Sequence, residues 1–270
     1  MTLIDLQGRN LYVGDQPVSK VYKGSRMIHG TIEYVMGTDA DFTGNGPNFK
    51  YVGSAEYIEI PDKIRNYSLT SYYGLFQGTN IKGVKSTNTR ITRMDNMFRD
   101  TTAETIDVSQ LDTSSVTLTS SMFQGSQAEE IIGIENLNLS NVGTLTNMFR
   151  DSKVKKLDLS LWDLKEVTSV ASIFRGSIVE HIDISTWVTP KIINGAELFS
   201  DSTIKAVDFG DWNIARVGTA NSRNFNANSE LTTVYAMHPT TASIIRTNSI
   251  SGTTVTESPP PEGFYDWKNN

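Results

Sequence analysis

A phenylalanine that usually follows an apolar residue recurs along most of the chain. It stands at intervals of 22 to 26 residues, at Phe76, Phe98, Phe123, Phe149, Phe174, Phe199 and Phe225. In six of these seven copies, an Asp or Gly follows two positions later and a Ser or Thr three positions later, which is typical of a turn. A repeat of this length indicates a solenoid, in which each unit packs against its neighbours.

Each unit also contains a pattern that is typical of a short strand. Apolar residues stand five, eight and, in four copies, ten positions after the phenylalanine, as Val154, Leu157 and Leu159 do after Phe149. Alternation of apolar and polar residues indicates a strand with one buried face. We therefore predict one short strand in every unit.

The residues just before each phenylalanine have a different spacing. Leu145, Met148 and Phe149 are separated as i, i+3 and i+4, which is typical of one turn of an amphipathic helix. Hydroxyl residues ahead of such a turn, such as Thr168, are able to cap it. Each unit is thus expected to hold a strand, a corner, a short helix or 3₁₀ turn, and a second corner. The predicted fold class is an α/β-type, β-rich repeat solenoid of about seven coils.

The repeat resembles that of a known protein family. The segment from Leu157 to Asp163, which reads Leu-Asp-Leu-Ser-Leu-Trp-Asp, together with Val167 and Phe174, is similar to the repeat of BspA-like leucine-rich-repeat proteins, a bacterial surface class. The resemblance extends from about Phe76 to Met237 and implies stacked leucine-rich-repeat coils. Residues 51–61 resemble a degenerate earlier coil.

The limits of the repeat divide the chain into three parts. We predict an N-terminal β element at residues 1–47, the solenoid at 48–237 and a C-terminal cap or linker at 238–270. A solenoid exposes apolar surface at its ends and needs caps. Phe264, Tyr265 and Trp267 are therefore expected to fold back onto the final coil, and a linker to another subunit is the alternative.

The N-terminal part carries a second resemblance. Residues 11–18 and 20–25 predict two strands around a Gly-Asp-Gln-Pro turn. This stretch is similar to a short element of phage tail and baseplate structural proteins. The resemblance implies a virion protein whose N-terminal element docks to other virion proteins.

Composition excludes several kinds of chemistry. The chain has 270 residues, no cysteine, and 24 Lys and Arg against 30 Asp and Glu, so thiolate metal sites and disulfides are excluded and nucleic acid is not an expected partner. His29, His181 and His238 lack metal-site spacing, and no nucleophile elbow or phosphate-binding glycine motif is present. No apolar run is long enough to span a membrane. We expect no enzyme activity, no metal and no cofactor.

The repeat places four carboxylates at equivalent positions beside the strands. A calcium site or a site for sugar hydroxyls is one interpretation, because neighbouring coils bring such groups close together. The favoured interpretation is that each carboxylate accepts backbone N–H groups from its own corner. The candidate residues are Asp107, Asp158, Asp183 and Asp208.

Two further sets of residues recur in the same way. Tryptophans thirteen positions after the phenylalanine, at Trp162, Trp187 and Trp212, would stack on sugars if exposed; burial at the coil corner is favoured, because three exposed tryptophans would make a large apolar patch. Arginines directly after the phenylalanine stand at Arg99, Arg150 and Arg175. With acidic neighbours beside them, a solvated ion-pair edge is favoured over an anion site.

These observations lead to a functional hypothesis. We expect a non-enzymatic phage virion protein, associated with a tail, fibre or baseplate, whose solenoid presents a surface to a host receptor protein or glycan. It would be assembled in the host cytoplasm and be present in several copies as a homo-oligomer or particle component. The first alternative is an assembly, decoration or connector protein with no host contact, and the second is a bacterial surface adhesin.

Overall fold

The computed structural model describes residues 34–217, 227, 230–248 and 252–269, together with four short strands before them. These strands form two antiparallel hairpins, of β1 (Leu11–Val13) with β2 (Gln16–Val18) and of β3 (Val21–Lys23) with β4 (Arg26–His29). Two strands around a turn at residues 14–17 had been predicted. That prediction is wrong in detail, because Gln16 and Pro17 belong to β2 and pair with Val13 and Tyr12.

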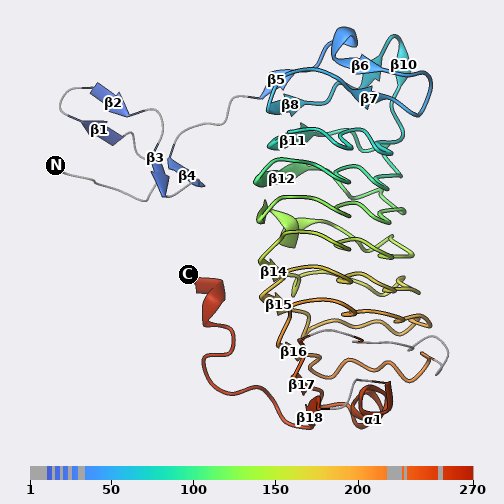
Figure 1. The fold of residues 1–270 in the computed structure, drawn as a ribbon. Helices are drawn as coiled ribbons and strands as arrows, with labels where there is room; N and C mark the ends of the chain where they lie inside the picture. Colours follow the sequence, from blue (N-terminus) through green and yellow to red (C-terminus); the bar gives the residue numbers. More distant parts are fainter. Residues whose placement is uncertain are drawn as a thin grey trace.

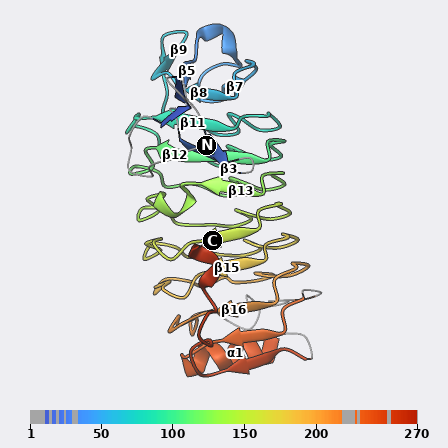
Figure 2. The same ribbon diagram turned by 90° about the vertical axis from the view of Figure 1, so that its left-hand side faces the viewer.

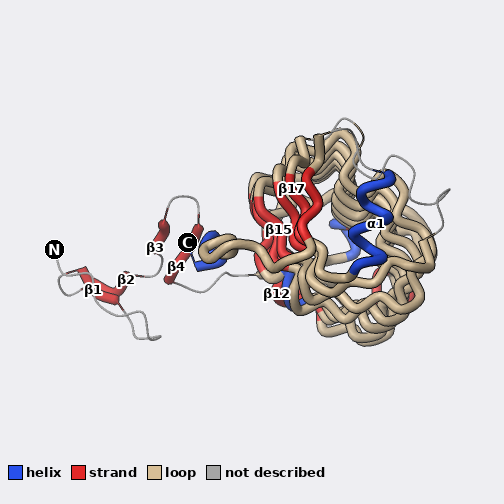
Figure 3. Tube along the Cα trace, turned by 90° about the horizontal axis from the view of Figure 1, so that it is seen from below, coloured by secondary structure: helices blue, strands red, loops and turns tan. Residues whose placement is uncertain are grey.

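The rest of the described chain is a column of stacked coils with its strands on one side (Figures 1 and 3). All of these strands pair in parallel, as sequential coils require. They are β5 (Val35–Met36), β8 (Tyr57–Glu59), β11 (Gly83–Ser86), β12 (Thr105–Leu111), β13 (Glu130–Ile132), β14 (Lys156–Asp158), β15 (His181–Asp183), β16 (Ala206–Asp208), β17 (Thr233–Tyr235) and β18 (Thr254–Thr256).

The remaining elements are short and lie at corners and ends. The pairs β6 with β7 and β9 with β10 are antiparallel. The elements are η1 (Asp39–Asp41), β6 (Phe42–Thr43), β7 (Lys50–Tyr51), β9 (Lys63–Ile64), β10 (Tyr67–Ser68), η2 (Ile134–Asn136), α1 (Pro239–Asn248) and η3 (Asp266–Asn269). Within the described ranges, none of the helices has the length and apolar character that crossing a membrane requires.

The β-rich solenoid is confirmed, with about eight turns rather than seven. The additional turn contains β8, in the segment that resembles a degenerate earlier coil. Tyr51 takes the place of the repeated phenylalanine there, and its ring centroid lies 5.4 Å from that of Phe76. The parallel sheet begins at β5, before residue 48, where the repeat pattern places the start of the solenoid.

The core contains a stack of phenylalanine rings from six successive coils. Neighbouring ring centroids lie 5.3 to 5.8 Å apart, and the ring planes differ by 10° or less. All six rings, of Phe76, Phe98, Phe123, Phe149, Phe174 and Phe199, are fully buried. Aromatic pairs at these separations are stabilising beyond their burial alone, so the repeated phenylalanine is the residue that joins one coil to the next.

In the six coils from Phe76 to Phe199, the leg before the phenylalanine is a series of β-turns, and the predicted helix or 3₁₀ turn is absent there. The N–H of Met148 donates to Leu145 O at 3.1 Å, and two residues later the N–H of Arg150 donates to Asn147 O at 3.1 Å. The N–H of Phe149, which lies between them, donates to Ile173 O of the next coil at 2.9 Å. Asn147 has φ 59°, which ends any helix. The tandem turns bury the same i, i+3 and i+4 positions as a helix would.

A second regularity appears two positions after the phenylalanine in the six coils from Phe76 to Phe199, where Gly and Asp alternate from coil to coil. All of these residues have positive φ, between 55° and 73°. The Asp151 carboxylate lies over Gly176 of the next coil, so closely that a Cβ on Gly176 would overlap with Oδ1. Asp100 lies over Gly125 in the same way. The alternating residues are Gly78, Asp100, Gly125, Asp151, Gly176 and Asp201.

Helix α1 closes the C-terminal end of the column (Figure 1). Its residues Thr241, Ala242 and Ile245 are buried. The Thr241 hydroxyl accepts the N–H of Ile214 at 3.2 Å and donates to the carbonyl of Trp212. The end of the solenoid is therefore covered by α1. The aromatic residues that follow α1 lie beside the strands instead.

Candidate functional site

The outer surface of the parallel strands is the most regular surface of the protein, and we call it the strand face. In β14, Leu157 points inward and is fully buried, while Lys156 and Asp158 point outward. The next strand repeats this arrangement in register, so that Asp158 pairs with Asp183. One carboxylate per coil therefore recurs along much of the strand face, and we call Asp107, Asp158, Asp183 and Asp208 the Asp row.

Each member of the Asp row is fixed by the corner that follows its strand. Oδ1 accepts the backbone N–H two residues later, at 2.9 Å for Asp107, 3.1 Å for Asp158, 2.9 Å for Asp183 and 2.6 Å for Asp208. In two coils a serine hydroxyl adds a second bond, from Ser160 at 2.6 Å and from Ser185 at 2.7 Å. These residues therefore act as acceptors within their own corners, which was the favoured interpretation.

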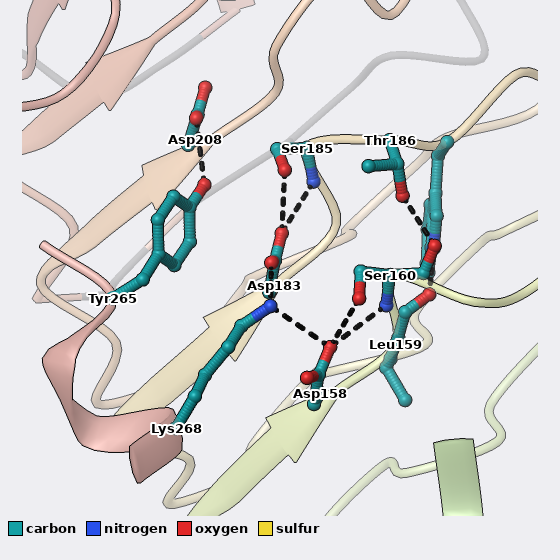
Figure 4. Close-up of polar contacts among 10 residues, drawn as sticks. Asp158, Leu159, Ser160, Asp183, Ser185, Thr186, Asp208, Tyr265 and Lys268 are labelled. Carbon is teal, nitrogen blue, oxygen red and sulfur yellow. Dashed lines mark hydrogen bonds and ion pairs between the residues drawn. The ribbon is translucent and has the colours of Figure 1, made fainter. Parts of the chain in front are cut away.

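The chain end crosses the strand face and contacts three members of the Asp row (Figures 2 and 4). We call residues 264–268 the C-terminal strap. The Lys268 ammonium lies between Asp158, at 3.2 Å from Oδ1, and Oδ2 of Asp183. The Tyr265 hydroxyl donates to Asp208 Oδ2 at 2.7 Å.

Aromatic contacts complete the seat of the C-terminal strap. The Trp267 ring stacks on His181 of β15, with centroids 5.6 Å apart. Phe264 packs edge-on against Tyr235 of β17 at 5.4 Å. The predicted folding back of these aromatic residues thus runs along the strand face, from β17 towards β14, instead of over the end of the column.

The fourth member of the Asp row is contacted from the other end of the chain. The Tyr34 hydroxyl donates to Asp107 Oδ2 at 3.4 Å, and its ring meets Tyr57 edge-on at 5.9 Å. Side chains from both ends of the described chain therefore supply donors to the Asp row. Sequence reasoning missed Tyr34 and Lys268, because both lie outside the repeat and no local pattern marks them.

Charge and burial act together at these contacts. Burial alone would lower the pKa of Lys268, but its hydrogen bonds to Asp183 and Asp158 outweigh burial and raise the pKa. Burial likewise opposes ionisation of Asp158, yet bonds from Ser160 and Lys268 lower its pKa. Burial raises the pKa of Tyr265, and the bond to Asp208 raises it further. Lys268 and Asp158 are therefore held charged, and Tyr265 is held as a donor.

The calcium interpretation of the Asp row finds no geometric support. Among the residues that the structure describes, no group of three or more His, Asp or Glu side chains is arranged to hold a metal ion. At Asp158 and Asp183 the ammonium of Lys268 supplies the positive charge. Neighbouring carboxylates are thus neutralised from within the chain.

The tryptophan set is part of the core. Trp162, Trp187 and Trp212 are at most 3% exposed, so they have no free face for stacking on a sugar. Their indole N–H groups bond across coils, to Ile134 O at 2.9 Å for Trp162 and to Leu159 O at 3.0 Å for Trp187. Burial at the corner was the favoured interpretation, and as binding residues these tryptophans are excluded.

The arginine set forms an edge of partly exposed ion pairs. Arg99 Nε lies 3.3 Å from Asp100, and Arg150 Nε lies 3.2 Å from Asp151. Arg175 contacts Glu197 at 2.6 Å and Asp201 at 3.4 Å. Each guanidinium already has a carboxylate partner. The arginine set therefore forms the ion-pair edge that was favoured, and an anion site has no support here.

A pocket lies beside the C-terminal strap on the strand face. It has a volume of about 400 Å³. Glu180 and His181 line it from the β15 coil, Lys205 from the β16 coil, and Phe264 and Trp267 from the strap. The strap thus leaves part of its own seat unfilled.

The parallel coils, the phenylalanine stack and the Asp row define a BspA-like β-solenoid. Residues 68–174 and 121–236 each match the family model described as "Mycoplasma protein of unknown function, DUF285". Together these overlapping matches cover more than half of the chain, and the chain belongs to this family. No curated protein and no solved structure matches the chain significantly. The resemblance of the N-terminal element to phage tail proteins gains no support from these comparisons.

Proposed function

We propose that this chain is a non-enzymatic recognition protein whose solenoid presents a rigid surface to a protein or glycan partner. The observation that carries the proposal is the strand face, where the Asp row fixes acceptors at the equivalent position of four coils and these acceptors already receive donors from other segments. Repeat proteins bind through extended surfaces of this kind. The partner is expected to lie across several coils, because the fixed acceptors recur from coil to coil.

The buried polar groups support a scaffold role. The hydroxyl of Tyr72 is hydrogen-bonded to Ser86 at 2.6 Å in the core, and burial raises the pKa of Tyr72 to about 12. Asp183 and Asp208 are also buried, and each closes a corner. These groups have structural partners, which favours a binding protein over an enzyme.

The family match fits a surface-repeat protein, and so a surface adhesin is the favoured form of this proposal. The virion form, as a tail, fibre or baseplate component that meets a host receptor, depends on residues 11–28, whose side chains lie outside the described residues. In the connector form, the solenoid contacts only other subunits of an assembly. The adhesin and virion forms require binding to a cell surface, whereas the connector form does not.

Binding of the fluorescently labelled full chain to intact bacterial and animal cells tests the proposal. We expect saturable binding that the unlabelled chain displaces, with protease treatment of the cells removing a protein receptor and periodate treatment removing a glycan. Ile132→Arg changes an outward position on β13 and is expected to weaken this binding. Lys165→Glu, on an exposed corner, is the matched control. If no cell type gives saturable binding at micromolar concentration, the recognition role is refuted and the connector form is favoured.

A further inference from the structure

We propose that the strand face over β14, β15 and β16 is a binding site for a basic protein segment that forms a tight turn and carries a tyrosine and, three positions later, a lysine. The C-terminal strap occupies this site as a ligand built into the same chain. This proposal rests on the recognition role proposed above, because it takes the strand face as the surface that binds the partner. It assigns the strand face a ligand class, and it assigns residues 264–268 a role other than capping.

The acceptors of this site are fixed before any ligand arrives. Each carboxylate is held by the N–H of its own corner through Oδ1. Oδ2 of Asp183 and Asp208 then accepts the donors of the strap, whereas at Asp158 the ammonium of Lys268 shares Oδ1 with the corner. Strands in successive coils are separated by roughly 4.8 Å, so Asp158, Asp183 and Asp208 form an evenly spaced row. The strap turns between Tyr265 and Lys268, where η3 begins, and a 3₁₀ turn advances roughly 2 Å per residue. Donors three residues apart are thus separated by roughly 6 Å along the segment, close to one coil spacing, and Tyr265 and Lys268 reach different members of the row.

The C-terminal strap is attached to this surface through its side chains. Its described backbone hydrogen bonds are internal, with the N–H of Phe264 donating to Pro261 O at 3.2 Å and that of Lys268 donating to Tyr265 O at 3.0 Å. Side chains therefore fix it to the solenoid: Tyr265 and Lys268 bond to the carboxylates, and Phe264 and Trp267 add their aromatic contacts. Donors of the same chemistry on another segment would satisfy the same acceptors.

The strap fits the site incompletely. The aromatic side chains of Phe264, Tyr265 and Trp267 remain half-buried. The pocket of about 400 Å³ between the strap and the β15 and β16 coils stays open, with Glu180 at its wall. A segment with larger or additional side chains would bury more apolar surface there, which favours binding by about 25 cal/mol per Å².

Charge complementarity specifies the occupant as basic. Four carboxylates, from Asp158, Asp183, Asp208 and Glu180, lie around the seat and its pocket, against one solenoid cation, Lys205, in the pocket lining. The strap brings one cation, Lys268, and one carboxylate of its own, Asp266. A partner segment with a second basic residue in place of that carboxylate would match the excess of acidic groups better, because complementary charges favour the encounter and the choice of partner.

The test uses the full chain and a labelled peptide with the sequence of residues 261–270. Tyr265→Ala/Lys268→Glu is the release variant, in which the strap loses both contacts to the Asp row. Fluorescence anisotropy is expected to show at least tenfold tighter binding of the peptide by the release variant than by the native chain. The reason is that a tethered strap competes at an effective concentration in the millimolar range. Lys268→Gln alone is expected to give the same result with a smaller increase.

Two further variants separate the site from general charge effects. Adding Asp183→Asn to the release variant is expected to weaken peptide binding at least tenfold. Adding Lys165→Glu instead, which changes charge on an exposed corner, is expected to leave the affinity unchanged. A peptide in which the lysine is replaced by glutamate is expected to lose binding.

Several results would overturn the inference. Equal affinity of the native chain, the release variant and Lys268→Gln for the peptide would show that the strap does not occupy the site. Absent binding to variants with native circular dichroism and thermal unfolding, or binding that is indifferent to Asp183→Asn, would exclude the site itself. Failure of the recognition role is seen separately, because cell binding by the native chain is measured without the peptide. Peptide binding without any cell binding would refute only that role.

Discussion

Gly176 provides a test of how neighbouring coils fit together. Its φ is +64°, and a Cβ there would overlap with Oδ1 of Asp151 in the preceding coil. The Asp151 carboxylate is also paired with Arg150, with Oδ2 at 3.2 Å from Nε. In Gly176→Ala, the new methyl group forces this carboxylate out of its position, in addition to placing alanine in the left-handed region.

The expected destabilisation has two parts. Left-handed backbone costs a residue with a Cβ about 1 to 2 kcal/mol. Moving Asp151 off its rotamer costs about 0.5 to 1.5 kcal/mol, and the weakened ion pair adds only a few tenths, roughly, because its side chains are partly exposed. We expect Gly176→Ala to lower the free energy of unfolding by about 2 to 4 kcal/mol.

Urea unfolding followed by circular dichroism measures this effect, with Gly78→Ala as the matched control. Gly78 occupies the equivalent position with φ +73°, and no atom lies within 4 Å of the place of a new Cβ, so only the backbone cost of about 1 to 2 kcal/mol applies. In an Asp151→Gly background, the cost of Gly176→Ala is expected to fall to the Gly78→Ala value. Equal costs for the two alanine variants, with no change in that background, would refute the fit of Asp over Gly.

Four other outcomes are expected. Phe149→Ala, in the middle of the ring stack, should cost about 3 to 5 kcal/mol in urea unfolding, and Phe149→Leu much less. Trp187→Phe removes the indole donor to Leu159 O, which keeps one bond from the N–H of Trp162, so it should cost about 0.5 to 1.5 kcal/mol by the same measurement. Lys268→Met should increase the quenching of Trp267 fluorescence by iodide; unchanged quenching would contradict the strap contacts. The pKa of Asp158 is lowered, so its charge stabilises the strap contacts fully above its ordinary pKa of 3.8. The pKa of Lys268 is raised, so its charge stabilises them fully below its ordinary pKa of 10.5. Strap contacts measured by quenching should therefore be strongest between these values, weaken as pH falls below 3.8, and weaken again as pH rises through the raised pKa of Lys268.

Residues that repeat could be predicted because each copy supplies the same local evidence. The phenylalanine spacing predicted a solenoid of stacked coils with one strand in each, whereas the ring stack of Phe149 and its neighbours is a finding of the structure. The same reasoning predicted that Asp183 would bond to its own corner and that Trp187 would be buried. Burial and turn chemistry at these positions depend on residues that lie close in the sequence.

The remaining features depend on conformations and contacts that periodicity does not specify. Leu145, Met148 and Phe149 have a helical spacing, but left-handed Asn147 lies among them, and tandem turns bury the same side chains. Lys268 meets Asp158 across 110 residues of sequence. No repeated pattern relates two such positions, so the seat of the C-terminal strap could be found only from the structure.

The alternation of Asp and Gly has a consequence for how such a chain grows or shrinks. From Gly78 to Asp201 the unit that repeats fully is a pair of coils, since Asp100 and Asp151 each lie over a Gly in the coil that follows. Duplication or loss of a single coil would bring either Asp next to Asp, with a steric overlap and two like charges side by side, or Gly next to Gly, without the contact of Asp over Gly. Changes by two coils keep every contact. Within this stretch, the number of coils is therefore expected to differ between variants of the protein by even numbers.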